Sequence, residues 1–267
     1  MLNTEQKPDG WPIQARCWLE WVIVIVSKFE IPTQRSPRCV GHPAKVQYYR
    51  VALNKTQILN LIQTTRLIAI MRGNFVNQYH QVVAALSEAG VAAVELSLVS
   101  PDAYKILAQM VKDFGTNIAI GAGTVTTVEQ VERVRDCGAG FVISPALNKD
   151  VIAATLGAQL ASFPGAYTPS EIANASELGA DAVKLFPASS LGPNFVRAVR
   201  SPFPDFRLVP TGGVGLAEIP AYLKAGAWAV AVGSELVNDS CVKDEHFAAL
   251  RDRAQAFVLA ARGEQVA

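Results

Sequence analysis

The chain has 267 residues, of which 50% are hydrophobic and 18% are charged, and its formal net charge is +1. This composition supports a large core but gives no overall field that would attract nucleic acid or an anionic membrane surface, so neither partner is expected. The four cysteines show no CxxC or metal-ligand spacing, and the three histidines are too scattered to share a metal locally. We therefore expect a reduced, cytoplasmic protein without a metal centre.

Residues 1–55 differ in character from the rest of the chain. They hold five prolines and three of the four tryptophans and show no sustained periodicity. Their apolar run, Trp18–Val26, is too short to span a bilayer and contains Glu20, and it lacks a convincing small-residue cleavage site. We interpret the segment as an irregular N-terminal extension; a partner-binding arm is the alternative.

Short apolar runs alternate with amphipathic stretches from about residue 57 onward. The predicted strands are Leu67–Met71, Ala92–Leu96, Ile118–Ile120, Phe141–Ile143, Leu160–Phe163, Ala182–Phe186, Leu208–Pro210 and Trp228–Val232. Stretches between them, such as Val76–Ala89 and Val125–Cys137, have helical spacing, and glycines that follow them mark helix ends. Eight such units predict an α/β fold of the (β/α)8 or TIM-barrel type over residues 56–267, which suits this length better than a doubly wound open sheet.

Lys184 lies inside an apolar, strand-like run, Ala182–Pro187. Such a strand is normally buried on both faces, and burying an unpaired ammonium is costly, so the neutral amine is favoured. A neutral amine can attack a carbonyl and form a Schiff base. The alternative is that the aliphatic stem passes between outer helices and carries its charge to water.

Two further charged residues occupy strand ends, where the functional groups of such barrels gather. Arg72 follows the first strand, and Glu95 lies within the second. The guanidinium can hold a carboxylate in bidentate fashion, and the carboxylate can move protons. A salt bridge between Arg72 and Glu95 at the barrel mouth is the alternative interpretation.

Glycine-rich loops follow three of the predicted strands. Gly212-Gly213 and Gly233-Ser234 come after the seventh and eighth strands, where barrels often hold a phosphate on backbone N–H groups, so phosphate binding is favoured over plain turns. Gly121-Ala122-Gly123 is not a dinucleotide fingerprint, because Thr126 stands where a third glycine is required.

Taken together, these segments resemble the KDPG/KDPGal aldolases, bacterial enzymes that split 2-keto-3-deoxy-6-phospho sugar acids. The similar stretches follow the family's order and are Leu67–Gly73, Val94–Leu98, Gly121–Val125, Val183–Ala188, Thr211–Val214 and Gly233-Ser234. The resemblance covers about residues 57 to 262 and does not include the N-terminal extension.

The resemblance implies a class I aldolase without metal or cofactor, usually a homotrimer, acting on a phosphorylated 2-keto-3-deoxy sugar acid. Lys184 would be the Schiff-base lysine, Glu95 the general acid and base, and Arg72 the ligand of the pyruvate carboxylate, with Thr124 near the pyruvyl group. The phosphate would be held by Gly212, Gly213, Gly233 and Ser234.

The run after the glutamate strand bears on which sugar acid is the substrate. Gluconate-type enzymes typically carry Leu-Arg-Thr there, whereas this chain has Leu98–Pro101, which lacks the arginine and matches the galactonate-type Asn-Ser-Pro except at Val99. The resemblance therefore favours 2-dehydro-3-deoxy-6-phosphogalactonate, with the gluconate epimer as alternative. Two other hypotheses are a phosphosugar isomerase or synthase that uses Lys184 only as a charge, and a non-catalytic phosphometabolite-binding barrel.

Overall fold

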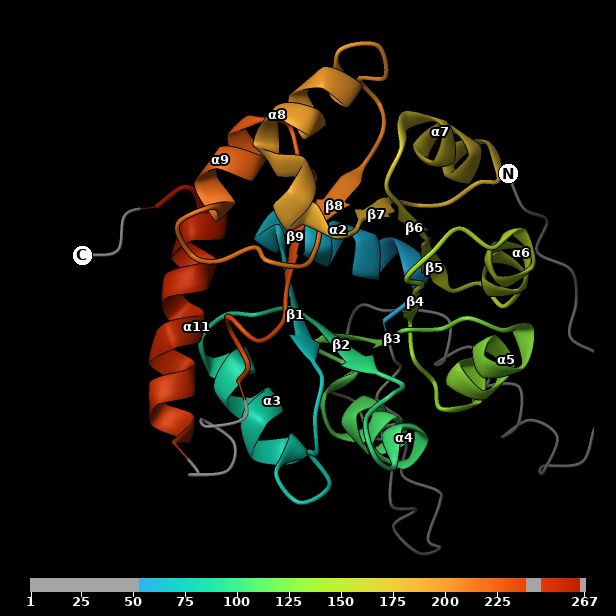
Figure 1. The fold of residues 1–267 in the computed structure, drawn as a ribbon. Helices are drawn as coiled ribbons and strands as arrows, with labels where there is room; N and C mark the ends of the chain where they lie inside the picture. The colour runs from blue at the N-terminus through green and yellow to red at the C-terminus, as the bar shows by residue number, and fades with distance from the viewer. Residues whose placement is uncertain (1–52, 239–245, 265–267) are drawn as a thin grey trace, which may run out of the picture. The chain divides into compact units, whose positions relative to one another are not determined.

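The computed structural model describes residues 53–238 and 246–264. Strands and helices alternate as predicted, except that a short strand that was not predicted, Gly165–Ala166, follows the fifth strand without a helix between them (Figure 1). The strands are β1 Leu67–Met71, β2 Ala93–Ser97, β3 Ala119–Gly123, β4 Phe141–Ile143, β5 Ala161–Phe163, β6 Gly165–Ala166, β7 Val183–Leu185, β8 Leu208–Pro210 and β9 Val230–Val232. The helices are α2 Lys55–Thr65, α3 Tyr79–Glu88, α4 Ala103–Phe114, α5 Val128–Asp136, α6 Lys149–Gly157, α7 Pro169–Glu177, α8 Ala188–Arg200, α9 Ile219–Lys224 and α11 Phe247–Arg262. The predicted extension lies, except for its last three residues, outside the described part of the chain.

All strand pairs within the sheets are parallel, which confirms the predicted α/β class. The strands form two sheets, β5-β4-β3-β2-β1-β9 and β6-β7-β8. Closure into the single eight-stranded barrel stays a prediction. Pro164 separates β5 from β6, because proline has no N–H to donate to a neighbouring strand. Between β8 and β9 the sheet pairing is reduced to one isolated bridge, Thr211 to Ala231, beside a hydrogen bond from the Trp228 N–H to the Leu208 carbonyl.

Successive residues of a strand contribute to two different apolar clusters, as the pleat requires. In β1, Leu67, Ala69 and Met71 belong to a large outer cluster shared with the surrounding helices. Ile68 and Ile70 belong to a smaller inner cluster. The buried members of the inner cluster are Ile58, Ile62, Ile68, Ile70, Ala93, Ala119, Phe141, Ile143, Ala161, Phe163, Ala182, Val209, Ala229 and Ala231.

Helix α2 covers one end of the inner cluster with Ile58 and Ile62, and in Figure 1 it crosses the centre of the view. A capping box starts the helix, because the Asn54 side chain accepts from the Gln57 N–H and the Gln57 side chain accepts from the Asn54 N–H. Lys55 forms an ion pair of 2.9 Å with Asp181, whose carboxylate also accepts from the Ser162 N–H. The capping box and the ion pair hold the helix next to the amino ends of β5 and β7.

Helix ends agree with the predicted glycine signals. Gly90, Gly138, Gly179 and Gly226 follow the ends of α3, α5, α7 and α9, each with a positive φ between 79° and 102°. That conformation is free of steric cost only for glycine, so these residues turn the chain towards the next strand. In the described residues, no helix is long and apolar enough to cross a membrane.

Candidate active site

Lys184 is buried at the centre of β7, with only 4% of its surface exposed. It lies two residues after Ala182, a member of the inner cluster, so the strand alternation turns both side chains to the same face. The lysine lines a cavity of about 340 Å³, and its Nζ is 5.0 Å from the centroid of the Phe186 ring. The predicted burial of the amine is thereby confirmed.

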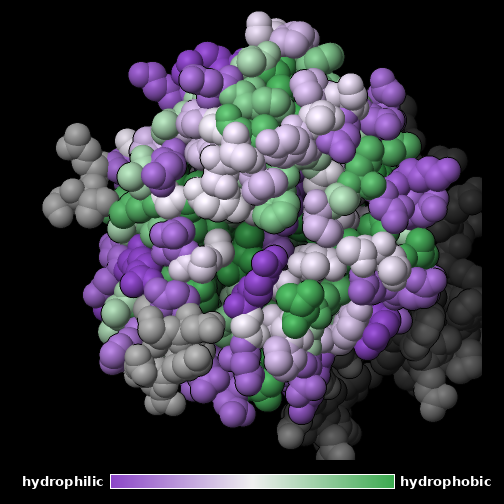
Figure 2. Space-filling model, in the orientation of Figure 1, coloured by the Kyte–Doolittle hydropathy of each residue, from purple (hydrophilic) through white to green (hydrophobic). Residues whose placement is uncertain are grey.

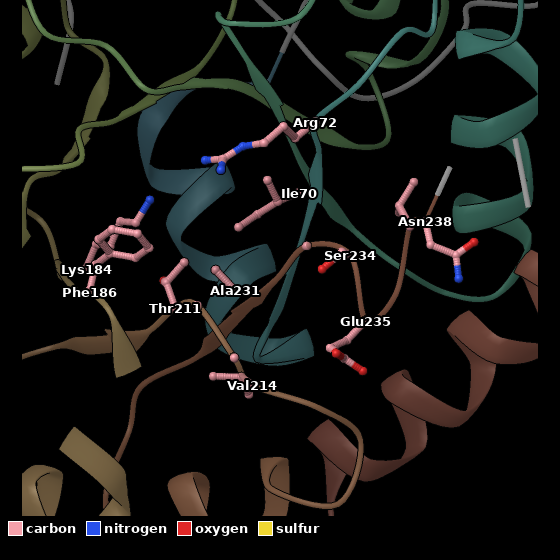
Figure 3. A pocket seen from close by; sticks show the side chains of 14 residues that line it. Ile70, Arg72, Lys184, Phe186, Thr211, Val214, Ala231, Ser234, Glu235 and Asn238 are labelled. Carbon is pink, nitrogen blue, oxygen red and sulfur yellow. The ribbon is translucent and has the colours of Figure 1, made fainter. Parts of the chain in front are cut away.

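Arg72 follows β1 and lines the same cavity. Figure 3 shows its guanidinium and the Lys184 amine directed towards the same open space, with Phe186 beside the lysine. The surface drawn in Figure 2 is hollowed near its centre, where hydrophobic and strongly hydrophilic residues meet. The arginine itself is exposed, so an anion can reach it from solvent.

Glu95 is buried within β2 at 1% exposure, and its Oε2 has no hydrogen-bond partner among the described residues. Burial raises the pKa of this carboxyl, while the positive charges of Lys184 and Arg72 act in the opposite direction. The room for the carboxyl comes from Gly123 on the neighbouring strand, because a Cβ there would collide with the Glu95 side chain. A buried carboxyl of this kind, close to two cations, can accept and return a proton.

Thr124 follows β3 in the left-handed conformation, with a φ of 62°. Its hydroxyl lies 2.8 Å from the hydroxyl of Ser97, which is buried at the end of β2. Neither Thr124 nor Glu95 is among the residues that line the cavity beside Lys184. Glu95 lies on β2 and Thr124 directly follows the adjacent strand β3. The charge of Glu95 acts on this cavity through its electrostatic coupling to Lys184 and Arg72.

The predicted glycine loops line the cavity on its other side. Gly212 and Gly213 have φ values of 88° and 72°, and a Cβ at either position would come within 3.0 Å of Phe186 or Ser189. Side chains are therefore excluded, and the backbone is left to face the cavity. Gly233-Ser234 lines it as well, so all four residues predicted to hold a phosphate are brought together.

Several lining residues were not predicted from the sequence, among them Thr211, Glu235 and Asn238. Thr211 is buried and follows Val209 of the inner cluster by two positions, so the strand alternation could have found it. Figure 3 shows Glu235 next to Ser234 at the side of the cavity away from Lys184. No sequence signal pointed to Glu235, because a carboxylate is not expected beside an anion-binding loop.

The site combines the buried amine of Lys184, a carboxyl that interacts electrostatically with it, the guanidinium of Arg72 and a part of the cavity that is lined by glycine backbone. An amine so placed can form a Schiff base, a guanidinium can hold a carboxylate, and glycine N–H groups can hold a phosphate. In residues 53–238 and 246–264, no three His, Cys, Asp or Glu side chains are grouped so that they could hold a metal ion.

Comparison with known proteins identifies aldolases that are similar to this chain. The family model described as KDPG and KHG aldolase matches residues 58–252. The probable 2-dehydro-3-deoxy-6-phosphogalactonate aldolase of Rhizobium meliloti (strain 1021) is 40% identical over 173 residues, which are 64% of this chain and 81% of the relative. The 2-dehydro-3-deoxy-6-phosphogalactonate aldolase of Escherichia coli (strain K12) is 34% identical over 171 residues, 64% of this chain and 83% of that protein.

Solved structures agree. A native KDPGal structure superposes with a TM-score of 0.70 at 32% identity, covering 74% of this chain and 94% of the other. The KDPG aldolase of Legionella pneumophila, with pyruvate captured at low pH as a covalent carbinolamine intermediate, superposes with a TM-score of 0.71 at 27% identity over 76% and 98% of the two chains. The chain belongs to the KDPG and KHG aldolase family.

Proposed function

We propose that the protein is a class I aldolase, a carbon-carbon lyase that cleaves 2-dehydro-3-deoxy-6-phosphogalactonate to pyruvate and glyceraldehyde 3-phosphate. The observation that carries the proposal is the buried amine of Lys184 facing a cavity that Arg72 also lines. A shielded amine with a carboxylate-binding cation nearby matches a substrate that has a 2-keto group next to a carboxylate.

The ends of the substrate find complementary groups at opposite sides of the cavity. Arg72 binds the carboxylate beside the keto group. Thr124, which does not itself line the cavity, is assigned to the pyruvyl end of the substrate. The phosphate sits at the other side, on the backbone of Gly212-Gly213 and Gly233-Ser234. Holding both ends orients the C2 carbonyl towards Nζ of Lys184.

The reaction then follows from the amine and the carboxyl. Nζ of Lys184 adds to C2, and loss of water gives an iminium. Glu95, through a water molecule, accepts the proton of the C4 hydroxyl, and the C3–C4 bond breaks as its electron pair moves into the iminium to form an enamine. Glyceraldehyde 3-phosphate leaves, Glu95 returns the proton to C3, and water adds at C2 to release pyruvate and the free amine.

The choice of epimer rests on the loop after β2 and on the relatives. This loop carries Val99, which is 64% exposed, where gluconate-type enzymes carry an arginine. The relatives from Rhizobium and Escherichia bear the galactonate name, whereas a relative from Treponema pallidum, 32% identical, is a 2-dehydro-3-deoxy-phosphogluconate aldolase. Cleavage of the gluconate epimer is therefore the second candidate function.

We also propose that the two sheets close into one eight-stranded barrel formed by residues 56–267, with residues 1–55 outside it. Supporting contacts cross both junctions: the Lys184 N–H donates to the Pro164 carbonyl at 2.9 Å, and the Trp228 N–H donates to the Leu208 carbonyl at 2.9 Å. The matched residues 58–252 fall within this unit. A homotrimer and a cytoplasmic location remain predictions; sedimentation velocity tests the former.

Borohydride trapping tests the mechanism. Pyruvate is incubated with the protein, borohydride is added, and the modified peptide is located by mass spectrometry. We expect the adduct on Lys184 and none on Lys55, which is tied to Asp181. Failure to modify Lys184 would overturn the Schiff-base proposal and favour an isomerase or a binding protein.

A pyruvate-release assay with both epimers, offered side by side, tests the substrate. We expect the larger kcat/KM with the galactonate epimer. A larger value with the gluconate epimer would select the second candidate, and no release with either would leave a binding protein.

A further inference from the structure

A second cavity of about 420 Å³ lies at the amino ends of the strands whose carboxyl ends carry the candidate active site. Arg66 directly precedes β1, Arg207 directly precedes β8, and Trp228 lies two residues before β9; all three line this cavity. Arg200, near the end of α8, adds a third guanidinium. The two cavities therefore share three strands but open at opposite ends of them.

Among the residues that the structure describes, no carboxylate neutralises the positive charge of the second cavity. Its lining contains three arginines and no acidic residue. Within the described residues, none of these arginines forms an ion pair with a carboxylate. Asp205 lines only the adjoining cavity, together with Arg207. Burial lowers the pKa of Arg66, as expected for a partly buried cation without a compensating anion.

The cations are held in place by backbone contacts. Nη2 of Arg66 donates to the Ala227 carbonyl at 2.7 Å, and Nη1 of Arg200 donates to the Phe206 carbonyl at 2.8 Å. Arg207 lies over the Trp228 ring, with 5.4 Å between its guanidinium carbon and the ring centroid. Because each guanidinium has five N–H donors, these contacts leave further donors for a ligand.

We infer that this cavity binds a small polyanion, a phosphate ester or polyphosphate that carries at least two phosphate groups. Three fixed guanidiniums match several phosphates better than one, because arginine recognises phosphate oxygens in bidentate fashion. Trp228 lines the same cavity and lies between Arg207 and the Phe163 ring, so it gives the arginine a rigid support. Nothing in the aldolase reaction uses this end of the strands.

Calorimetric titration of the full chain with inorganic tripolyphosphate tests the inference. Arg207→Glu reverses a charge in the cavity, and Arg197→Glu makes the same change at an exposed position of α8 that does not line it. We expect Arg207→Glu to weaken binding at least about tenfold and Arg197→Glu to change it less than about twofold. An equal loss of affinity in both variants would mean that binding depends only on the overall charge of the protein, and would overturn the inference.

Hydrogen exchange of the unmodified protein provides a reading that needs no variant. With tripolyphosphate, we expect slower exchange of the backbone amides of residues 206–208 and 226–228. Protection confined to residues 211–214 and 233–235 would place the anion in the active-site cavity instead, and absence of saturable binding would exclude the site altogether. Arg207→Gln, checked for a native unfolding transition, replaces Arg207→Glu if the charge reversal impairs folding.

Discussion

The inward-facing residues at the two ends of the strands differ sharply in chemistry although both are buried. Nearer the amino ends, Ala93 of β2 and Ala182, next to β7, belong to the inner apolar cluster. Two residues further along, the same face carries Glu95 and Lys184, at 1% and 4% exposure. The alternation of side chains along a strand therefore places the active-site residues on the same face as the inner cluster, about 7 Å further along each strand. Burying the charged groups of Glu95 and Lys184 should lower the stability of the fold but favour their reactivity. Burying apolar side chains nearer the amino ends should stabilise the fold.

The largest effect is expected from Lys184→Met, which keeps bulk but removes the nucleophile. We expect kcat to fall by about 10⁴-fold or more, because the nucleophile is lost. We expect no loss in thermal stability, because methionine packs well against apolar side chains. Steady-state pyruvate release measures kcat, and calorimetry measures the thermal stability. Lys184→Arg keeps the charge and should be equally inactive; substantial activity in it would show that charge alone suffices.

Phe141→Ala tests the apolar end of the comparison. Phe141 is fully buried in the inner cluster, 5.7 Å from the ring of Phe163. We expect the free energy of unfolding to fall by about 3–5 kcal/mol in denaturant titration, while KM stays close to that of the parent protein. Phe203→Ala, at an exposed ring, should cost less than about 1 kcal/mol. A similar cost at both positions would contradict the assignment of Phe141 to the core.

Glu95→Gln sharpens the role of the buried carboxyl. Removing the proton carrier should lower kcat by about 10²–10⁴-fold and leave KM little changed. Glu177→Gln, at an exposed position near the end of α7, is the matched control and should behave like the parent protein. Unchanged kcat in Glu95→Gln would remove Glu95 from the reaction.

The same substitution should change how stability depends on pH. Burial raises the pKa of Glu95 in the folded state, so the folded chain holds its proton to higher pH than the unfolded chain. The contribution of Glu95 to the free energy of unfolding is then highest below the unfolded-state pKa of about 4.3 and decreases as pH rises through the raised value. Glu95→Gln lacks this decrease and should be more stable near neutral pH by on the order of 1 kcal/mol. Denaturant titrations of both proteins across pH measure this; a difference independent of pH would argue against it.

The smallest effect is expected at Glu235, which lines the cavity together with the glycine loops that are proposed to hold the phosphate. Glu235→Gln removes a repulsion that is exposed to solvent and screened by salt, so we expect KM to fall by only about two- to fivefold, and less at high ionic strength. Glu177→Gln again serves as control. A higher KM in Glu235→Gln would indicate that the carboxylate accepts a substrate hydroxyl.

Local sequence signals predicted the order of the elements and the main groups of the site. A glycine at a helix end or a lysine in an apolar strand acts through its immediate neighbours, so the positive φ of Gly90 and the burial of Lys184 could be foreseen. The resemblance to the aldolase family, confirmed by the comparisons, joined these signals into one activity.

Features that depend on distant contacts could not be foreseen. The hydroxyl pair of Ser97 and Thr124 joins two strands, and its geometry needs a left-handed residue that no sequence rule assigns to threonine. The sheet is interrupted at Pro164 because proline has no N–H to donate. Whether a missing N–H interrupts a sheet depends on the strand that lies beside it, and the sequence does not show that neighbour. Glu235 was missed because its neighbours predicted an anion site, which a carboxylate opposes.

The cap of helix α2 sets a limit on how far the protein can be shortened. Asn54 and Lys55 anchor this helix through the capping box and the ion pair to Asp181. A truncated chain that begins at residue 53 keeps both anchors. One that begins at residue 56 loses them, and of the contacts described here Asp181 then keeps the hydrogen bond from the Ser162 N–H. The contacts that anchor this helix therefore begin a few residues before the point at which the aldolase family match begins.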